Sequence, residues 1–316
     1  MNQFLKQQTE KKRGSLQEDW PSQYLETISC PLCKSPKYKL LYKKTYSRIV
    51  KCEHCSLIYT NPRLKSQYLK HLYTKSYFQN TNSSHFGYEN YLGDKIKIIK
   101  TFSKRLKQIE KFIPRGSLLD VGCATGFFLK VAYDNKWKVE GLEISKYAAN
   151  IARSQLGFNI YEKGLQEPKI LGKKYTLITL WDVIEHFYDP KKELQSIHTL
   201  LKKDGLLVIS TPDVGSIPSL ISGHRWVGYK LSDEHLMYFS EKTIKLLLKG
   251  TGFEVIKITH VGKHVSMTML ADRISLYNKF MGSIVKKISS SFAEDFNLYV
   301  NPYDIMCVYA RKKDKQ

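Results

Sequence analysis

The sequence lacks any long apolar run and any recognisable export signal. No stretch of about 18 or more apolar residues occurs, and the first twenty residues have no apolar signal-peptide core. These absences exclude a spanning helix and favour a protein that is not exported. The hydrophobic content of 42% is nevertheless that of a globular chain. We therefore expect a cytoplasmic protein.

Acidic residues and arginines are also scarce. The 316 residues include 51 Lys and Arg against 29 Asp and Glu, a formal net charge of +22. Such an excess suggests polyanions or an anionic membrane surface as partners. Only nine of the 51 basic residues are arginines, however, and arginine makes most bidentate contacts to phosphate and guanine. The lysine bias therefore favours a solvated surface over a nucleic-acid-binding face.

Four of the six cysteines form two C-x2-C pairs with eighteen residues between them. Cys30 and Cys33 stand in "SCPLCK", and Cys52 and Cys55 stand in "KCEHCS". Each such knuckle places two thiolates on one side of a tight turn, and two knuckles complete a tetrahedron around Zn2+. Two disulfides would instead need an oxidising compartment. We predict a structural zinc ion and a zinc ribbon over residues 27–62, with a short hairpin between the knuckles.

The remaining pattern is that of one large α/β domain over residues 95–316. A polar, loosely ordered tail over 1–26 precedes the ribbon, and a connector over 63–94 follows it. One apolar stripe predicts a helix that Pro114 ends, with its apolar positions at Ile99, Phe102, Leu106, Ile109 and Ile113.

Strands and helices then alternate along the chain. Strands are predicted near 117–121, 138–143, 158–161, 175–181 and 205–210, with helices over 127–136, 146–156 and 190–203. Ser145 and Asp189 are the expected N-caps of the last two helices. This alternation predicts an α/β fold with a doubly wound, mainly parallel sheet that binds ligands at the carboxyl ends of its strands.

The stretch "LLDVGCATGFFL", residues 118–129, predicts a ligand-binding turn between the first strand and the first helix after it. A dinucleotide fingerprint would need glycine where Ala124 and Phe127 stand, and the P-loop pattern is also absent. What remains is Asp120-x-Gly122-x-x-x-Gly126, followed at the end of the second strand by Glu143. Glycines allow close backbone approach, Asp120 can meet a cationic group, and Glu143 can accept ribose hydroxyls. The predicted ligand is a nucleoside with a positively charged tail and no pyrophosphate.

The segments "LLDVGCATGFFL", "VEGLEIS" and "LITLWDVIEHFYDP" together resemble the class I S-adenosylmethionine-dependent methyltransferases. The resemblance implies a seven-stranded Rossmann-like sheet, S-adenosylmethionine as cofactor and methyltransferase activity. It implies that Gly122 and Gly126 line the amino-acid portion of the cofactor, that Glu143 holds the ribose and that Asp182 lies near the methionine end. Leu165 or Gln166 would flank adenine. Cys123, within the same loop, is expected to be a small space-filling residue.

The zinc ribbon, with "YTNPR", "STPD" and "DEHLMYFS", resembles a group of bacterial small-molecule methyltransferases linked to surface-sugar and natural-product pathways. That resemblance implies a sugar, a glycan precursor or a related metabolite as acceptor, methylated on oxygen or carbon. Two other functions stay open: a ribosomal-RNA methyltransferase with an N-terminal zinc module, and an inactive scaffold that only binds the cofactor.

Candidate acceptor residues lie mainly in "SGHRWVGYKLSDEHLMYFS", residues 222–240. His235 is the preferred general base, because an unperturbed histidine pKa near 6.5 suits neutral pH. His186, beside Glu185, is the second choice, and His224 is a further candidate. Each of these histidines also has a purely structural interpretation. The stretch further contains possible acceptor-binding side chains, among them a phosphate- or carboxylate-orienting arginine: Arg225, Trp226, Asp233, Glu234 and Tyr238.

A helical insertion over residues 263–302 is predicted before the last strand. Seven apolar residues spaced three and four apart form one stripe over 266–288: Met267, Leu270, Ile274, Tyr277, Met281, Ile284 and Ile288. A lid or packing helix is the preferred interpretation. A self-association helix is a second, and a peripheral membrane helix that would suit a lipid-linked acceptor is a third.

Overall fold

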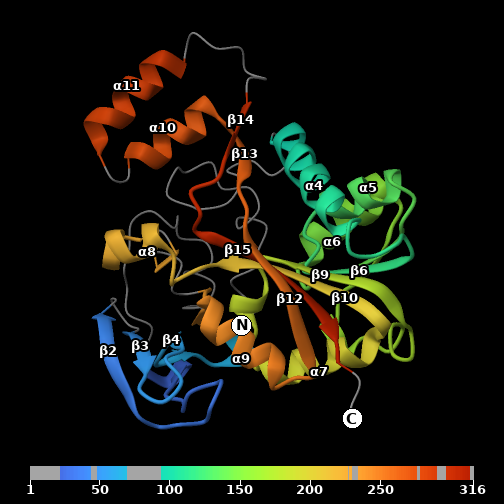
Figure 1. The fold of residues 1–316 in the computed structure, drawn as a ribbon, viewed down its shortest axis with the longest axis horizontal. Coiled ribbons are helices and arrows are strands. Elements are labelled where there is room, and N and C mark those ends of the chain that lie inside the picture. Colours follow the sequence, from blue (N-terminus) through green and yellow to red (C-terminus); the bar gives the residue numbers. More distant parts are fainter. Residues whose placement is uncertain are drawn as a thin grey trace.

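A seven-stranded sheet forms the centre of the structure (Figure 1). The computed structural model describes residues 22–43, 48–69, 94–226, 228–229, 234–275, 278–289 and 297–313. The strand order is β12-β15-β10-β9-β6-β7-β8, and only β15 runs antiparallel to its neighbours. The bounds are β6 Ser117–Val121, β7 Lys138–Leu142, β8 Asn159–Tyr161, β9 Tyr175–Trp181, β10 Leu201–Pro212, β12 Phe253–His260 and β15 Ile305–Lys312. The predicted doubly wound, mainly parallel sheet is confirmed.

Helices cover both faces of this sheet, because side chains along each strand alternate between two cores. Leu118 of β6 and Leu177 of β9 pack with the α4, α5 and α6 side, whereas Leu119 and Ile178 pack with the α7 and α9 side. These helices are α4 Lys95–Ile109, α5 Phe127–Asp134, α6 Lys146–Leu156, α7 Pro190–Leu200 and α9 Glu241–Lys249. The carboxyl ends of β6, β7, β9 and β10 consequently meet at one edge of the sheet.

Two helices end three or more residues earlier than the sequence predicts. α4 stops at Ile109 instead of running to Pro114, because the next residues form tighter turns in which Phe112 donates its amide to the Ile109 carbonyl. α7 stops at Leu200 because Leu201, fully buried, already pairs with Tyr175 of β9.

The two predicted N-caps behave differently. Asp189 accepts from the Lys192 amide at 3.2 Å, with Pro190 in the first turn, as expected. Ser145 stands at the N-cap of α6, but its side chain makes no capping hydrogen bond. Both residues thus occupy the predicted N-cap positions, but only Asp189 caps its helix with a side-chain hydrogen bond.

The two C-x2-C pairs flank a small sheet of order β11-β4-β3-β2: the first pair precedes β2, and the second follows from the end of β3 into the turn before β4. Its strands are β2 Tyr38–Lys43, β3 Arg48–Cys52, β4 Ile58–Thr60 and β11 Met237–Tyr238. The predicted hairpin between the knuckles is thus present as β2 and β3. The fourth strand was not predicted: β11 comes from the large domain, and Met237 pairs with Tyr59 and Tyr238 with Ile58. The ribbon is therefore joined to the large domain through a continuous sheet.

Flanking residues also contribute to the ribbon. η1 Ser22–Tyr24 precedes β1 Leu25–Glu26, and β1 pairs with β5 Arg63–Leu64, which is followed by α2 Ser66–Leu69. The expectation of a loose tail over 1–26 is wrong for residues 22–26, because Tyr24 is buried and β1 closes onto β5. Residues 1–21 of that predicted tail, and residues 70–93 of the predicted connector, lie outside the described residues.

The insertion over 263–302 contains a two-stranded stem and two helices instead of one helix. β13 Lys263–Ser266 pairs antiparallel with β14 Asn297–Val300, and the stem leads to α10 Met267–Ser275 and α11 Lys279–Ser289 (Figure 1). The expected single stripe over 266–288 is therefore wrong. The two helices pack on each other so closely that a Cβ at Gly282 would lie 1.8 Å from the Ser275 hydroxyl oxygen. No helix among the described residues is both long and apolar enough to cross a membrane.

Candidate active site

The turn between β6 and α5 contains both glycines predicted to line a cofactor. Gly122 has φ +74° and Gly126 has φ +85°, a left-handed conformation that other residues rarely adopt. The amides of Gly122 and Cys123 both donate to the Leu142 carbonyl, at 2.7 and 3.0 Å. A Cβ at Gly122 would lie 2.6 Å from a Val183 methyl, so the turn also needs the missing side chain for space. The turn is thus held between the ends of β7 and β9.

The Glu143 carboxylate binds the backbone of this turn. Its Oε2 accepts from the Ala124 amide at 2.9 Å, and its Oε1 accepts from the Ser145 amide at 2.8 Å. The residue is only 6% exposed. Because each carboxylate oxygen has a second lone pair, Glu143 can accept a ribose hydroxyl while it braces the turn.

Asp120 lies beneath the same turn and is 1% exposed. It accepts a hydrogen bond from the Thr179 hydroxyl at 2.6 Å. Burial, and after it the charge of Glu143, raise the pKa of Asp120 to about 8. A carboxyl group that is largely protonated near neutral pH is a poor partner for a cation. The burial and raised pKa of Asp120 therefore disfavour the expected direct contact of its carboxyl group with a cationic tail.

Three further predicted cofactor residues are two buried side chains, Cys123 and Leu165, and one exposed side chain, Gln166. Cys123 is buried, and its Sγ lies 2.6 Å from the position of a Cβ at Gly141, so it fills the space above that glycine. Leu165, in η3 Gly164–Gln166, packs in the core beneath the sheet. Gln166, beside it, is exposed. Of the two residues predicted to flank adenine, Gln166 is the one whose side chain is accessible.

Asp182 directly follows β9, has a strained backbone conformation and lies near positively charged side chains. Its φ is +55°, and its Oδ1 accepts from the Ser210 hydroxyl at 2.7 Å. Lys263 Nζ lies 3.2 Å from its Oδ2. Burial alone would raise the pKa of Asp182, but the charges of Lys263 and Arg105 outweigh it and hold that pKa well below its ordinary value. Asp182 is therefore an anion at neutral pH.

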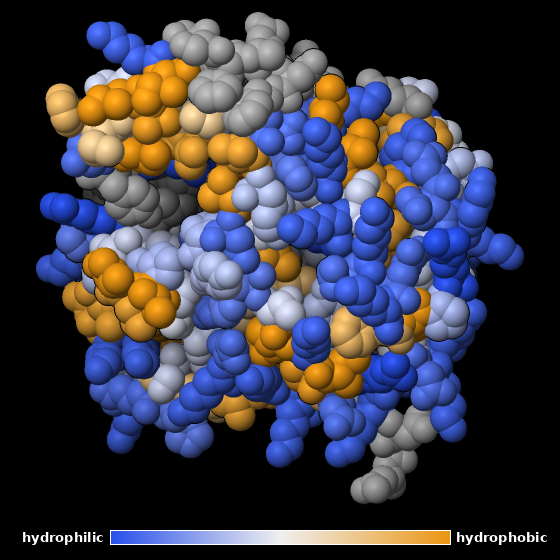
Figure 2. All heavy atoms as spheres, turned by 45° about the horizontal axis from the view of Figure 1, so that its top comes forward, coloured by the Kyte–Doolittle hydropathy of each residue, from blue (hydrophilic) through white to orange (hydrophobic). Residues whose placement is uncertain are grey.

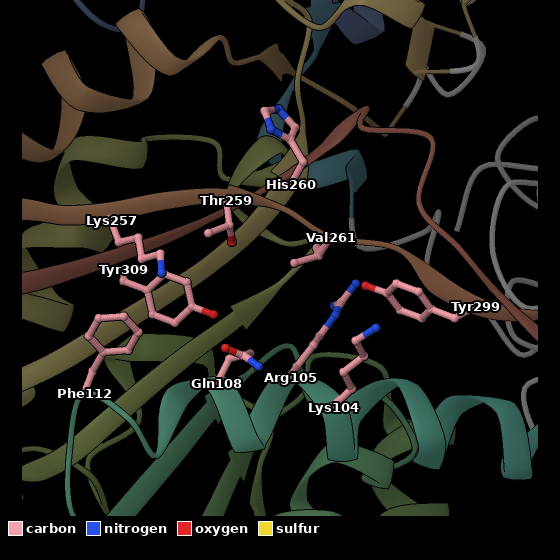
Figure 3. Close-up of a pocket in the computed structure, with 10 residues that line it drawn as sticks. All are labelled: Lys104, Arg105, Gln108, Phe112, Lys257, Thr259, His260, Val261, Tyr299 and Tyr309. Atoms are coloured by element: carbon pink, nitrogen blue, oxygen red, sulfur yellow. The ribbon is translucent and has the colours of Figure 1, made fainter.

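Arg105 lies next to a cavity of about 200 Å³ between α4 and the strands β12 and β15 (Figure 3). Arg105 is 6% exposed, and its Nε and Nη2 have no hydrogen-bond partner among the described residues. Its guanidinium lies 5.0 Å from the centre of the Trp181 ring. Two lysines, Lys104 and Lys257, add to the positive lining. Sequence reasoning missed Arg105, because it is one of eight basic residues between positions 95 and 115 and only the packing of α4 turns it inward.

Two of the three predicted catalytic histidines lie together. His186, in η4 Ile184–His186, and His235 have ring centres 4.8 Å apart. With Glu185 they form a group whose potential ligand atoms all lie within 4.8 Å of one another. His224, in η5 Gly223–Arg225, is exposed instead, and its ring faces Tyr42 of the ribbon at 6.2 Å between centres.

The environment of this group shifts every pKa in it. Burial lowers the pKa of His186 to about 4. Burial and the neighbouring His186 together lower the pKa of His235 to about 3. Burial, followed by the charge of Asp182, raises the pKa of Glu185 to about 8. The expectation of an unperturbed pKa near 6.5 for His235 is therefore wrong, because its ring is only 5% exposed.

Two of the other predicted acceptor residues, Trp226 and Tyr238, pack against the ribbon. Trp226, Tyr229 and Tyr238 are buried in a cluster with ribbon residues Ile49 and Ile58. That contact accounts for the aromatic density that suggested an acceptor pocket over 222–240. Of the three other candidates, Arg225 is exposed and Glu234 is buried. Asp233 lies outside the described residues.

The four cysteines of the two knuckles converge at one point. Cys30 Sγ lies 3.5 Å from Cys55 Sγ, Cys33 Sγ lies 3.5 Å from Cys52 Sγ, and none of the four is in a disulfide. The two knuckles have the same shape: the residue after each pair, Lys34 or Ser56, is left-handed, and its amide donates to the carbonyl of the first cysteine.

Comparisons with known proteins agree with this fold. The profile of a family described as "Methyltransferase domain" matches residues 94–258. An uncharacterized protein of Methanocaldococcus jannaschii is 27% identical over 158 residues, which cover 50% of this chain and 74% of that protein. A ubiquinone biosynthesis O-methyltransferase of Coxiella burnetii is 32% identical over 117 residues, which cover 34% of this chain and 49% of the enzyme. The match thus spans about half of the length of that curated enzyme.

Solved structures show a similar arrangement at low sequence identity. A SAM-dependent methyltransferase from Archaeoglobus fulgidus is 18% identical with a TM-score of 0.48, over 70% of this chain and 99% of that chain. The plantazolicin methyltransferase BpumL in complex with SAH is 17% identical with a TM-score of 0.45, over 71% of this chain and 85% of that chain.

Proposed function

This chain belongs to the methyltransferase-domain family, and we propose that it transfers a methyl group from S-adenosylmethionine to a small-molecule acceptor. We propose a sugar, a glycan precursor or a related metabolite as that acceptor, methylated on oxygen or carbon. The assignment of S-adenosylmethionine as the methyl donor rests on the family match. The matched residues include the left-handed glycine turn, which Glu143 braces at the carboxyl edge of the sheet.

Three positions at this edge suit the parts of the donor. Glu143 can accept ribose hydroxyls, and Gly122 and Gly126 leave room for the amino-acid portion. At the methionine end the donor carries an amine and a carboxylate. Asp182, an anion, and Arg105, a buried guanidinium with unpartnered nitrogens, offer the opposite charges. Gln166 is the accessible candidate beside adenine.

For the acceptor, we propose that proton removal occurs at the group of Glu185, His186 and His235. A hydroxyl or carbon acid must lose a proton as the methyl group arrives. His235 has a ring nitrogen, Nδ1, without a hydrogen-bond partner among the described residues. His224 is not included in this proposal, since it is exposed beside Tyr42 of the ribbon.

We propose that Cys30, Cys33, Cys52 and Cys55 hold one structural zinc ion. Zinc–sulfur bonds of about 2.3 Å in a tetrahedron place sulfur atoms about 3.8 Å apart. The 3.5 Å separations within the two cysteine pairs are close to that value. Four thiolates leave no open position, so the ion would organise the ribbon and would not take part in methyl transfer.

We propose an anionic membrane surface as an additional partner. Apolar side chains gather over α11 and over α8 Ile217–Ser222, on one side of the molecule (Figure 2). Phe280 is 72% exposed on α11, and Ile221 is 82% exposed on α8. Lys286 and Lys287 occupy the last turn of α11, and basic residues beside an exposed apolar face suit anionic lipids. Contact at this surface would suit a lipid-linked acceptor.

The proposed function is tested by calorimetry and by transfer of a labelled methyl group to candidate acceptors. Binding of S-adenosylmethionine and label in a sugar, glycan precursor or lipid-linked sugar are expected. RNA is the contrasting acceptor. If RNA were methylated, its affinity should fall steeply with salt, with log K dropping by about 0.7 for each phosphate contact on a single strand. Label in RNA with that salt dependence would replace the small-molecule assignment.

A further inference from the structure

Glu185, His186 and His235 form a second group of metal-ligand type, far along the chain from the cysteines. Glu185 and His186 follow β9, whereas His235 comes just before β11. One ligand atom from each lies within 4.8 Å of the other two. Two metal–ligand bonds of about 2.1 Å span at most about 4.2 Å, so small side-chain adjustments would bring the three atoms around one ion.

The unpartnered atoms in this group are those that a cation would bind. Glu185 is 1% exposed and its Oε1 has no hydrogen-bond partner, while His235 is 5% exposed and its Nδ1 has none among the described residues. A buried acceptor without a donor is costly, at about 1–3 kcal/mol for each group. A bound cation would satisfy both of these atoms at once.

Hydrogen bonds already orient the other atoms as in a metal site. His186 Nδ1 lies 2.9 Å from the Glu234 carbonyl oxygen. Because that carbonyl can only accept, Nδ1 must carry the proton, and Nε2 then carries the acceptor lone pair. The Thr211 hydroxyl donates to Glu185 Oε2 at 2.9 Å, which leaves Oε1 for another ligand. Metal-binding histidines and carboxylates are commonly held by such outer hydrogen bonds.

A similar cluster elsewhere in the chain lacks this property. Asp213, Glu241 and His260 also lie within 4.8 Å of one another. There, Asp213 Oδ2 is 2.9 Å from His260 Nε2, and Asp213 Oδ1 accepts from the Gly215 amide at 2.8 Å. Its aspartate is satisfied by protein groups, so that cluster gives no indication of an ion.

We propose that Glu185, His186 and His235 bind one divalent transition-metal ion at the acceptor side of the active site. Two imidazoles and one carboxylate favour Zn2+, Mn2+ or Fe2+ over Ca2+ or Mg2+, which prefer oxygen ligands. Three protein ligands leave open positions on the ion. The group also lies within the electrostatic reach of Asp182, the residue assigned to the methionine end of the donor.

The catalytic consequence rests on the proposed function. An acceptor hydroxyl on an open position of the ion would have a lowered pKa and would release its proton to solvent. The resulting oxygen would form a bond to the methyl carbon as the carbon–sulfur bond of the sulfonium breaks. The electron pair stays on sulfur, so the products are the methyl ether, S-adenosylhomocysteine and one proton. In this arrangement His235 acts as a metal ligand and not as the general base.

The test separates the two metal sites by the chemistry of the probe. Protein is loaded with one equivalent of Zn2+, which the four thiolates should take, and is then titrated with Mn2+, which disfavours thiolates. Free Mn2+ is followed by electron paramagnetic resonance. We expect one Mn2+ to bind per chain and a second equivalent of Zn2+ to displace it.

Variants locate the ion. Glu185→Gln keeps the shape of the side chain, and with His235→Ala it should weaken Mn2+ binding by at least about 10- to 100-fold. Glu241→Gln, in the satisfied cluster, is the matched control and should bind Mn2+ like the wild type. Circular dichroism and retention of one zinc per chain check that each variant is folded.

Two results would overturn the metal site: no Mn2+ or second Zn2+ bound by the wild type, or unchanged Mn2+ binding by folded Glu185→Gln. Calorimetry with S-adenosylhomocysteine keeps this outcome distinct from failure of the proposed function. Binding of that ligand without a second ion would refute the metal site alone. Absence of binding to the wild type would instead count against the methyl-donor site.

Discussion

Replacement of Glu143 by alanine should weaken cofactor binding and loosen the glycine turn at the same time. The carboxylate is 6% exposed and accepts two backbone hydrogen bonds, from Ala124 at 2.9 Å and from Ser145 at 2.8 Å. A hydrogen bond to a charged group contributes about 1.5–3 kcal/mol. Loss of one such bond to ribose corresponds to an increase in Kd of about 10- to 150-fold. Loss of the two bonds to the backbone should in addition lower the melting temperature of the ligand-free protein.

The assay is calorimetry with S-adenosylhomocysteine, which avoids turnover, together with thermal unfolding without ligand. Glu143→Gln should lie between wild type and Glu143→Ala, because its amide keeps one acceptor oxygen but presents an NH2 group to the other backbone donor. Glu254→Gln is the control, since Glu254 is exposed at the start of β12, at the opposite edge of the sheet from the turn. A folded Glu143→Ala protein that binds within about twofold of wild type would refute the ribose assignment.

Four further predictions concern other parts of the molecule. Chelation of zinc, or Cys33→Ser, should unfold the ribbon before the large domain; hydrogen exchange that protects both parts equally would contradict this. Thr60→Val should destabilise the protein by about 1–3 kcal/mol, because the buried Thr60 hydroxyl donates to the His235 carbonyl at 3.0 Å, whereas Thr60→Ser should be near wild type in denaturant unfolding. The pKa of Asp120, raised from 3.8 to about 8, means that the folded state keeps a proton which the unfolded state has lost, so stability should fall as pH rises between those values, by up to about 1.4 kcal/mol per pH unit. Asp120→Asn should remove that slope in ligand-free thermal unfolding, and an unchanged slope would reject it. Phe280→Ser should reduce co-sedimentation with anionic vesicles while Tyr133→Ser, an exposed aromatic on α5, should not; equal sedimentation of both variants would reject the α11 surface.

The parts of the structure that the sequence predicts correctly are those fixed by local pattern. The C-x2-C spacing brings Cys30 and Cys33 toward Cys52 and Cys55, because a knuckle is a local turn. The alternation of apolar strands with amphipathic helices gives the doubly wound sheet for a similar reason. Both features depend on residues that lie close together in the chain.

Features that depend on contacts between distant segments could not be predicted. β11 pairs with β4 across about 180 residues, and its two residues have no strand pattern of their own. The pKa of His235 depends on its burial in the folded protein and on His186 beside it, which is 49 positions earlier in the chain (235 − 186). The split of the insertion into α10 and α11 depends on how the two helices pack together, which an apolar stripe alone does not determine.

The contact between β4 and β11 gives the ribbon a second role besides its own stability. The Thr60 amide donates to the Leu236 carbonyl at 3.0 Å, and the Thr60 hydroxyl donates to the His235 carbonyl. Leu236 in turn donates its amide to the Glu185 carbonyl at 2.9 Å. One chain of backbone contacts thus runs from the ribbon strand through His235 to Glu185. β4 begins only three residues after Cys55. An ion that fixes the knuckles would therefore also fix the position of β4 and its pairing with β11. Structural zinc would then contribute to the geometry of the acceptor site without an open coordination position.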